Sequence, residues 1–138
     1  MPEAPVVLDS YALLAYFRGE SNGVQVRALL DKAAAHDIPL RMTDVSYAEV
    51  KYTLLKKDGE EAWEEASKIL ESLPIEFHST TRALADSAAE FKARFKISLA
   101  DAFSAALAQQ EKAELVTGDP EFRALEKAID ISWLKGAH

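Results

Sequence analysis

Four carboxylate side chains stand where predicted strands end or the following helices begin. They are Asp9, Glu49, Asp101 and Asp119. Asp9 lies between the apolar runs 6–8 and 12–14, and Asp101 lies in the largely apolar stretch 99–108. An ionised carboxylate in such surroundings is unfavourable unless it is paired or bound to a cation, and neighbouring carboxylates raise one another's pKa. A hard divalent cation would relieve both effects. With no cysteine and only scattered histidines, the sequence favours Mg²⁺ or Mn²⁺ over zinc.

The same four residues also suit a structural role as helix caps. Asp119 precedes Pro120, a residue type favoured at the first position of a helix. The segments 46–49 and 98–101 fit or nearly fit the capping box, in which a serine and an acidic residue cap a helix start together. Asp9 is a third candidate cap. Since helix starts gather at one edge of a parallel sheet, convergence alone does not separate caps from ligands, and both interpretations stay open.

The spacing of apolar residues predicts short strands alternating with helices. The expected strands cover residues 6–8, 38–42, 75–78, 115–117 and 129–133, the last of them at an edge of the sheet. The expected helices cover residues 11–17, about 24–35, 43–58, 63–73, 84–95 and 98–110, with a short helix beginning at 120. This order predicts one α/β domain over residues 1–138, with a central, mostly parallel sheet of about five short strands and helices on both faces. In such a sheet the four carboxylates should meet at one edge.

Composition limits the classes of protein that fit. The chain has 138 residues, 49% apolar and 28% charged, which suffices for one core. The absence of cysteine excludes disulfides and thiolate nucleophiles. The longest apolar run, residues 11–17, is too short to span a membrane, so we expect a cytoplasmic protein with no membrane partner. The net charge of −7 gives no general affinity for nucleic acid. Five basic residues are candidate phosphate contacts, with a plain surface role as the alternative for each: Arg18, Lys51, Lys92, Arg94 and Lys96.

Four segments resemble, in order, the motifs of PIN-domain ribonucleases. They are residues 6–10 (VVLDS), 43–50 (TDVSYAEV), 98–103 (SLADAF) and 115–122 (LVTGDPEF). They occur at suitable intervals and cover the chain nearly end to end. The likeness is greatest to VapC-type toxins of toxin–antitoxin pairs.

The resemblance implies a metal-dependent endoribonuclease that hydrolyses RNA phosphodiester bonds. It implies that four residues line a Mg²⁺ or Mn²⁺ site: Asp9, Glu49, Asp101 and Asp119. Thr117 matches a hydroxyl position near that site, and Ser10 would support it. The family also implies a homodimer and a small antitoxin partner whose tail can block the active-site groove. We expect Asp9 and Asp101 to be the principal ligands because their surroundings are the driest, and one of the other two to accept a proton from the attacking water.

Other functions stay open beside this one. A PIN-domain RNA-processing nuclease without an antitoxin would carry the same motifs, and so would a catalytically inactive binding module that kept the helix caps. Such a module would not be stabilised by Mn²⁺, whereas a metal site would. An aspartyl-phosphate phosphatase or receiver fits less well. It would carry a second aspartate two residues after Asp9, where Tyr11 stands, and a lysine soon after Val116.

Overall fold

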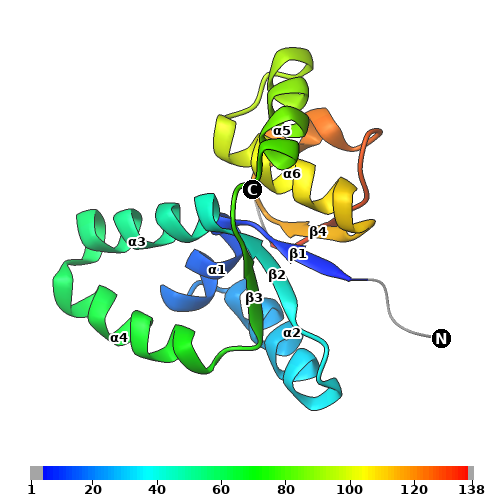
Figure 1. The fold of residues 1–138 in the computed structure, drawn as a ribbon. Helices are drawn as coiled ribbons and strands as arrows, with labels where there is room; N and C mark the ends of the chain where they lie inside the picture. Colours follow the sequence, from blue (N-terminus) through cyan, green and yellow to red (C-terminus); the bar gives the residue numbers. More distant parts are fainter. Residues whose placement is uncertain (1–4, 137–138) are drawn as a thin grey trace.

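Five short parallel strands form the central sheet of the computed structural model, which describes residues 5–136, in the order β3-β2-β1-β4-β5 (Figure 1). The strands are β1 (Val6–Leu8), β2 (Leu40–Thr43), β3 (Ile75–His78), β4 (Glu114–Thr117) and β5 (Ile131–Trp133). The helices are α1 (Ser10–Phe17), α2 (Gly23–His36), α3 (Asp44–Asp58), α4 (Glu60–Ser72), α5 (Arg82–Arg94), α6 (Leu99–Glu111) and the 3₁₀ helix η1 (Pro120–Leu125). The parallel sheet and the edge position of the last strand confirm the prediction.

The central strand β1 fixes where the carboxylates lie. Val7 pairs with Arg41 of β2 and with Leu115 of β4, and Leu8 pairs with Val116. Because these strands run parallel, β1, β2 and β4 all end at one edge of the sheet. The helices α1, α3 and η1 begin there, directly after those strands.

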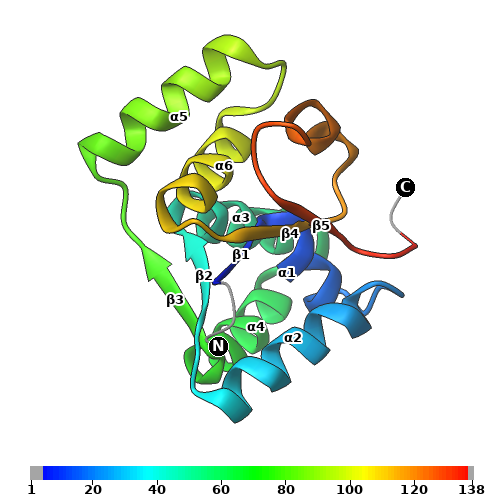
Figure 2. The same ribbon diagram turned by 90° about the vertical axis from the view of Figure 1, so that its right-hand side faces the viewer.

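Different helices cover the two faces of the sheet. Val7 and Leu115 pack in a core with α5, α6 and η1, whereas Leu8 and Val116 pack in a second core with α1 to α4. Figure 2 shows α5 and α6 on one side of the strands and α1, α2 and α4 on the other. Val7 and Leu8 are both 0% exposed. A strand buried on both faces has no need of polar alternation, which explains the continuous apolar run of β1.

The most deeply buried helix is α6. Every residue from Asp101 to Ala108 is buried, which confirms the expectation that this stretch lies inside the protein. Asp101 is therefore carried into the core by the apolar residues around it. Among residues 5–136, no helix combines the length and the apolar composition needed to cross a membrane.

The predicted helix over 43–58 is confirmed, but the box at 46–49 does not cap it. The Thr43 hydroxyl caps α3 by accepting a hydrogen bond from the Ser46 amide at 2.9 Å, so the cap lies three residues before Ser46. Ser46 lies inside the helix, where its hydroxyl is 3.1 Å from that of Ser104 on α6. Glu49 consequently falls in the second turn of α3 and takes no part in capping.

Candidate functional site

Asp9 is a buried carboxylate that both caps a helix and faces other acids. Its Oδ1 accepts the Ala12 amide at 2.9 Å and its Oδ2 accepts the Thr117 hydroxyl at 2.5 Å. The residue is only 2% exposed. Burial, together with the smaller effects of the charges of Asp119 and Glu49, raises the pKa of Asp9 to about 7, although the two hydrogen bonds partly oppose the rise. A carboxyl with this pKa is poised between its neutral and charged forms near neutral pH.

Asp101 is the second buried carboxylate, in the first turn of α6. Its amide donates to the Ser98 hydroxyl, which caps the helix, at 3.1 Å. In a full capping box the Asp101 carboxylate would accept the Ser98 amide, but the Glu121 carboxylate accepts that amide instead. The Asp101 carboxylate is thus not used in capping. Burial, followed by the charges of Asp119, Asp9 and Glu121, raises its pKa to about 8.

Two hydroxyl groups hold the remaining predicted carboxylates in place. Thr117 donates to Asp9 and also accepts the Asp119 amide at 3.0 Å, so one buried hydroxyl links the ends of β1 and β4. Ser10 donates to Glu49 Oε1 at 2.8 Å, which ties the start of α1 to α3. Asp119 caps η1 by accepting the Glu121 amide at 2.9 Å. Thr117 and Ser10 thus lie beside carboxylates of the site.

Three carboxylates come close enough together to hold one cation. Oxygens of Asp101, Asp119 and Glu121 all lie within 4.8 Å of one another. Asp9 and Glu49 lie outside this group of three, although the charge of Asp9 acts on Asp101 and that of Glu49 acts on Asp9. Glu121 was not among the site residues predicted from the sequence. Its signal was present in the Asp-Pro-Glu sequence, which puts a second acid in the first turn of η1 at the same sheet edge.

None of the five carboxylates forms an ion pair with a basic side chain of residues 5–136. Within residues 5–136, the ion pairs join Arg18 to Asp58, Arg41 to Glu76 and Glu111, and His78 to Glu76, and none reaches the site. The close group of three offers only carboxylate oxygens, which Mg²⁺ and Mn²⁺ prefer as ligands. The donor set therefore fits a hard divalent cation, and Asp101, Asp119 and Glu121 could hold it.

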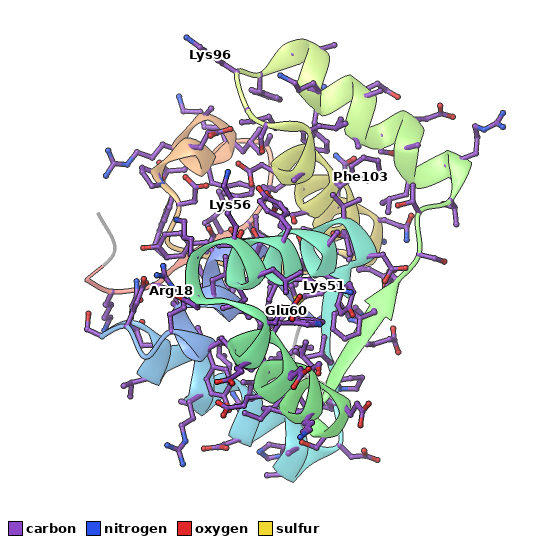
Figure 3. All side chains as sticks on the ribbon, turned by 90° about the vertical axis from the view of Figure 1, so that its left-hand side faces the viewer. Arg18, Lys51, Lys56, Glu60, Lys96 and Phe103 are labelled. Atoms are coloured by element: carbon purple, nitrogen blue, oxygen red, sulfur yellow. The ribbon has the colours of Figure 1, made fainter. Side chains whose placement is uncertain are left out.

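Most of the basic residues that the sequence proposed as phosphate contacts face elsewhere. Arg18 Nε lies 3.0 Å from Asp58 Oδ2. Lys51 Nζ lies 5.4 Å from the centroid of the Trp63 ring on α4, and Arg94 lies over the Phe95 ring. Figure 3 shows Lys96 pointing outward from the loop that follows α5. These contacts explain the positions of the side chains without a phosphate.

Comparison with family models places the fold. The model of the PIN domain matches residues 6–128. The chain belongs to the PIN-domain family. The matched range contains every carboxylate of the site.

Solved structures that resemble this PIN domain include proteins of toxin–antitoxin systems. DNA-bound VapBC from Salmonella typhimurium is 15% identical, with a TM-score of 0.71, over 96% of this chain and 99% of that one. VapBC2 from Rickettsia felis, bound to a DNA fragment from its promoter, is 18% identical, with a TM-score of 0.70, over 93% and 97%. VapC20 from Mycobacterium tuberculosis, a Sarcin-Ricin loop cleaving toxin, is 21% identical, with a TM-score of 0.65, over 86% and 93%. At these identities the likeness establishes the fold. No curated protein matches the chain significantly.

The raised pKa of Asp9 predicts how metal-free stability depends on pH. The unfolded carboxyl ionises near its ordinary pKa while the folded one stays neutral to about 7, so the folded state loses stability as the pH rises between these values. Asp9→Asn removes this loss and keeps a residue type that caps helices well. The free energy of unfolding of Asp9→Asn minus that of the parent should therefore increase by about 2 kcal/mol from about pH 5.5 to about pH 8.

Urea unfolding in EDTA, followed by circular dichroism at several pH values, measures this advantage. Glu114→Gln is the matched control, because Glu114 is exposed and begins β4 at the opposite edge of the sheet. The control should follow the parent at every pH. A constant difference between Asp9→Asn and the parent across this range would contradict the burial of an ionisable carboxyl.

Proposed function

We propose that this PIN domain is a Mg²⁺- or Mn²⁺-dependent endoribonuclease that hydrolyses RNA phosphodiester bonds and acts as the toxin of a type II toxin–antitoxin pair. The observation that carries the proposal is the group of carboxylates at one sheet edge. Two of them are buried with raised pKa values, and none forms an ion pair within the described part of the chain. Caps alone would not require this grouping, since each helix start needs only its own acceptor. A bound metal cation would reduce the repulsion between the carboxylates. It would also attract a phosphate group to a sheet edge whose negative charge would otherwise repel it.

The acidic residues of the site have different proposed roles. Asp101, Asp119 and Glu121 would hold the cation, with Asp9 next to them and fixed by the Thr117 hydroxyl. A bound Mg²⁺ or Mn²⁺ would neutralise charge on the phosphate and lower the pKa of the attacking water. The four residues predicted from the sequence, Asp9, Glu49, Asp101 and Asp119, all stay part of the proposed site. Asp101 and Asp119 would bind the cation together with Glu121, whereas Asp9 and Glu49 would act beside it.

Glu49 is suited to accept a proton. Its Oε1 accepts the Ser10 hydroxyl, which fixes the carboxylate at the border of the site. Its Oε2 has no hydrogen bond within the part of the chain that the structure describes. Because Glu49 lies outside the close group of three, it would keep an oxygen to take the proton of the attacking water.

Partners are proposed on the likeness to toxin–antitoxin complexes. The similar structures include VapBC proteins of three bacteria, S. typhimurium, R. felis and nontypeable Haemophilus influenzae. On this likeness we propose that the chain binds a small antitoxin, forms a homodimer and acts on an RNA substrate. The alternative is a PIN-domain RNA-processing nuclease that has no antitoxin.

RNA cleavage by the purified chain tests the nuclease. We expect cleavage of a structured RNA with Mg²⁺ or Mn²⁺, none in EDTA, and a loss on the order of 100-fold or more in Asp101→Asn, because a ligand of the cation is removed. Mn²⁺ should also raise the melting temperature of the parent and not that of Asp101→Asn. Glu114→Gln removes one negative charge at the opposite edge and should cleave like the parent. No cleavage by the parent, with no stabilisation by Mn²⁺, would favour the inactive binding module.

Growth of a bacterial host tests the toxin. Induced expression of the parent should arrest growth, and expression of Asp101→Asn should not, because arrest depends on cleavage. If a neighbouring gene encodes a small antitoxin, its co-expression should restore growth because the antitoxin would bind the parent chain. RNA cleavage without growth arrest would instead identify an RNA-processing nuclease that has no antitoxin.

A further inference from the structure

The residues on one side of α3 lie first in the core, then beside the carboxylates, and finally in solvent. Val45, Glu49, Tyr52 and Lys56 follow at intervals of four, three and four residues, the spacing of neighbours on one side of a helix. Val45 packs against the core formed with α5 and α6. Glu49 accepts the Ser10 hydroxyl at the start of α1. Tyr52 and Lys56 therefore extend the side of α3 that borders the site.

Tyr52 is an aromatic side chain that the core does not use. It is 56% exposed, whereas Tyr47 on the same helix packs edge-on against Trp63 and Phe77. Tyr52 contacts no other aromatic ring within residues 5–136. An exposed ring beside a site for a phosphodiester can serve as a platform on which an unpaired base stacks.

Lys56 is a cation on the same side of α3. Figure 3 shows it rising from α3 on the side where α6 lies, whereas Lys51 lies on the side of α4 and over Trp63. Lys56 is exposed and forms no ion pair in the described part of the chain. From the helical rise, Tyr52 lies about 4.5 Å and Lys56 about 10.5 Å along the axis from Glu49. The Tyr52 ring is thus nearer to the carboxylates than the positive charge of Lys56 is.

We propose that Tyr52 and Lys56 position the RNA substrate, with Tyr52 stacking on an unpaired base next to the scissile phosphate and Lys56 binding the next phosphate along the strand. This inference rests on the proposed nuclease function and specifies its substrate as RNA that is unpaired beside the cleavage point. A base inside a duplex is already stacked and paired, so the Tyr52 ring could not reach its face. Lys56 would offset the repulsion that an acidic protein exerts on the strand.

Steady-state cleavage of a single-stranded RNA, and of the same RNA annealed to its complement, tests the inference with Mg²⁺ or Mn²⁺ present. Tyr52→Ala should raise KM for the single strand by about 10-fold and leave kcat within about twofold, because a stacking contact is lost without touching the carboxylates. Tyr52→Phe should restore KM because it keeps the ring. Lys56→Gln should raise KM and lower the slope of log KM against log salt concentration by about 0.7, the value for one phosphate contact on a single strand.

Lys51→Gln is the matched control for Lys56→Gln. It removes the same charge from the same helix on the side that faces α4, and it should leave both KM and the salt slope unchanged. Cleavage by the parent with an unaltered KM in Tyr52→Ala and an unaltered salt slope in Lys56→Gln would overturn this inference and leave the nuclease function standing. Equal cleavage of single-stranded and duplex RNA would also overturn it. An absence of cleavage by the parent would instead overturn the proposed function itself.

Discussion

Two buried carboxyl groups face other acids, and no positive side chain among residues 5–136 forms an ion pair with them. This constraint is the one on which the rest of the structure depends. Asp9 is 2% and Asp101 is 7% exposed, and the charge of Asp119 raises the pKa of each. Burial of a like-charged pair is unfavourable unless protons or cations are taken up. Among residues 5–136, hydrogen bonds from hydroxyls and amides fix the carboxylate oxygens, and no positive side chain compensates their charge. Uptake of a proton or of a cation would relieve this charge.

Helix capping and metal binding are compatible uses of the same side chains here. Asp9 and Asp119 cap α1 and η1, and both also act on the other acids of the site. Asp101 differs because the Ser98 hydroxyl caps α6 in its place, while the Glu121 carboxylate accepts a hydrogen bond from the Ser98 amide. Parallel strands bring these helix starts to one edge, so the backbone that ends β1 and β4 also sets the spacing of the ligands. Thr117 couples the two strands through one buried hydroxyl.

The sequence predicts the fold well because its signals are local. The strand at 75–78 was placed as observed, and the buried stretch of α6 was recognised from its apolar residues. β2 begins at Leu40, two residues later than predicted, after Ile38, which is exposed, and Pro39, which has no amide hydrogen to donate. What depends on tertiary packing was missed. Glu121 is an exposed residue whose part in the cluster arises only when η1 folds against α6, and Lys51 turns toward Trp63 because α4 packs on that side of α3.

Anomalous diffraction from a crystal of the protein containing Mn²⁺, grown near neutral pH or above, tests the central claim most directly. A bound cation should appear at the sheet edge, with oxygens of Asp101, Asp119 and Glu121 as its ligands and with Asp9 beside it. The same carboxylates with no manganese peak between them, or a peak at another place on the surface with these side chains turned apart, would contradict the claim that their grouping exists to hold a cation.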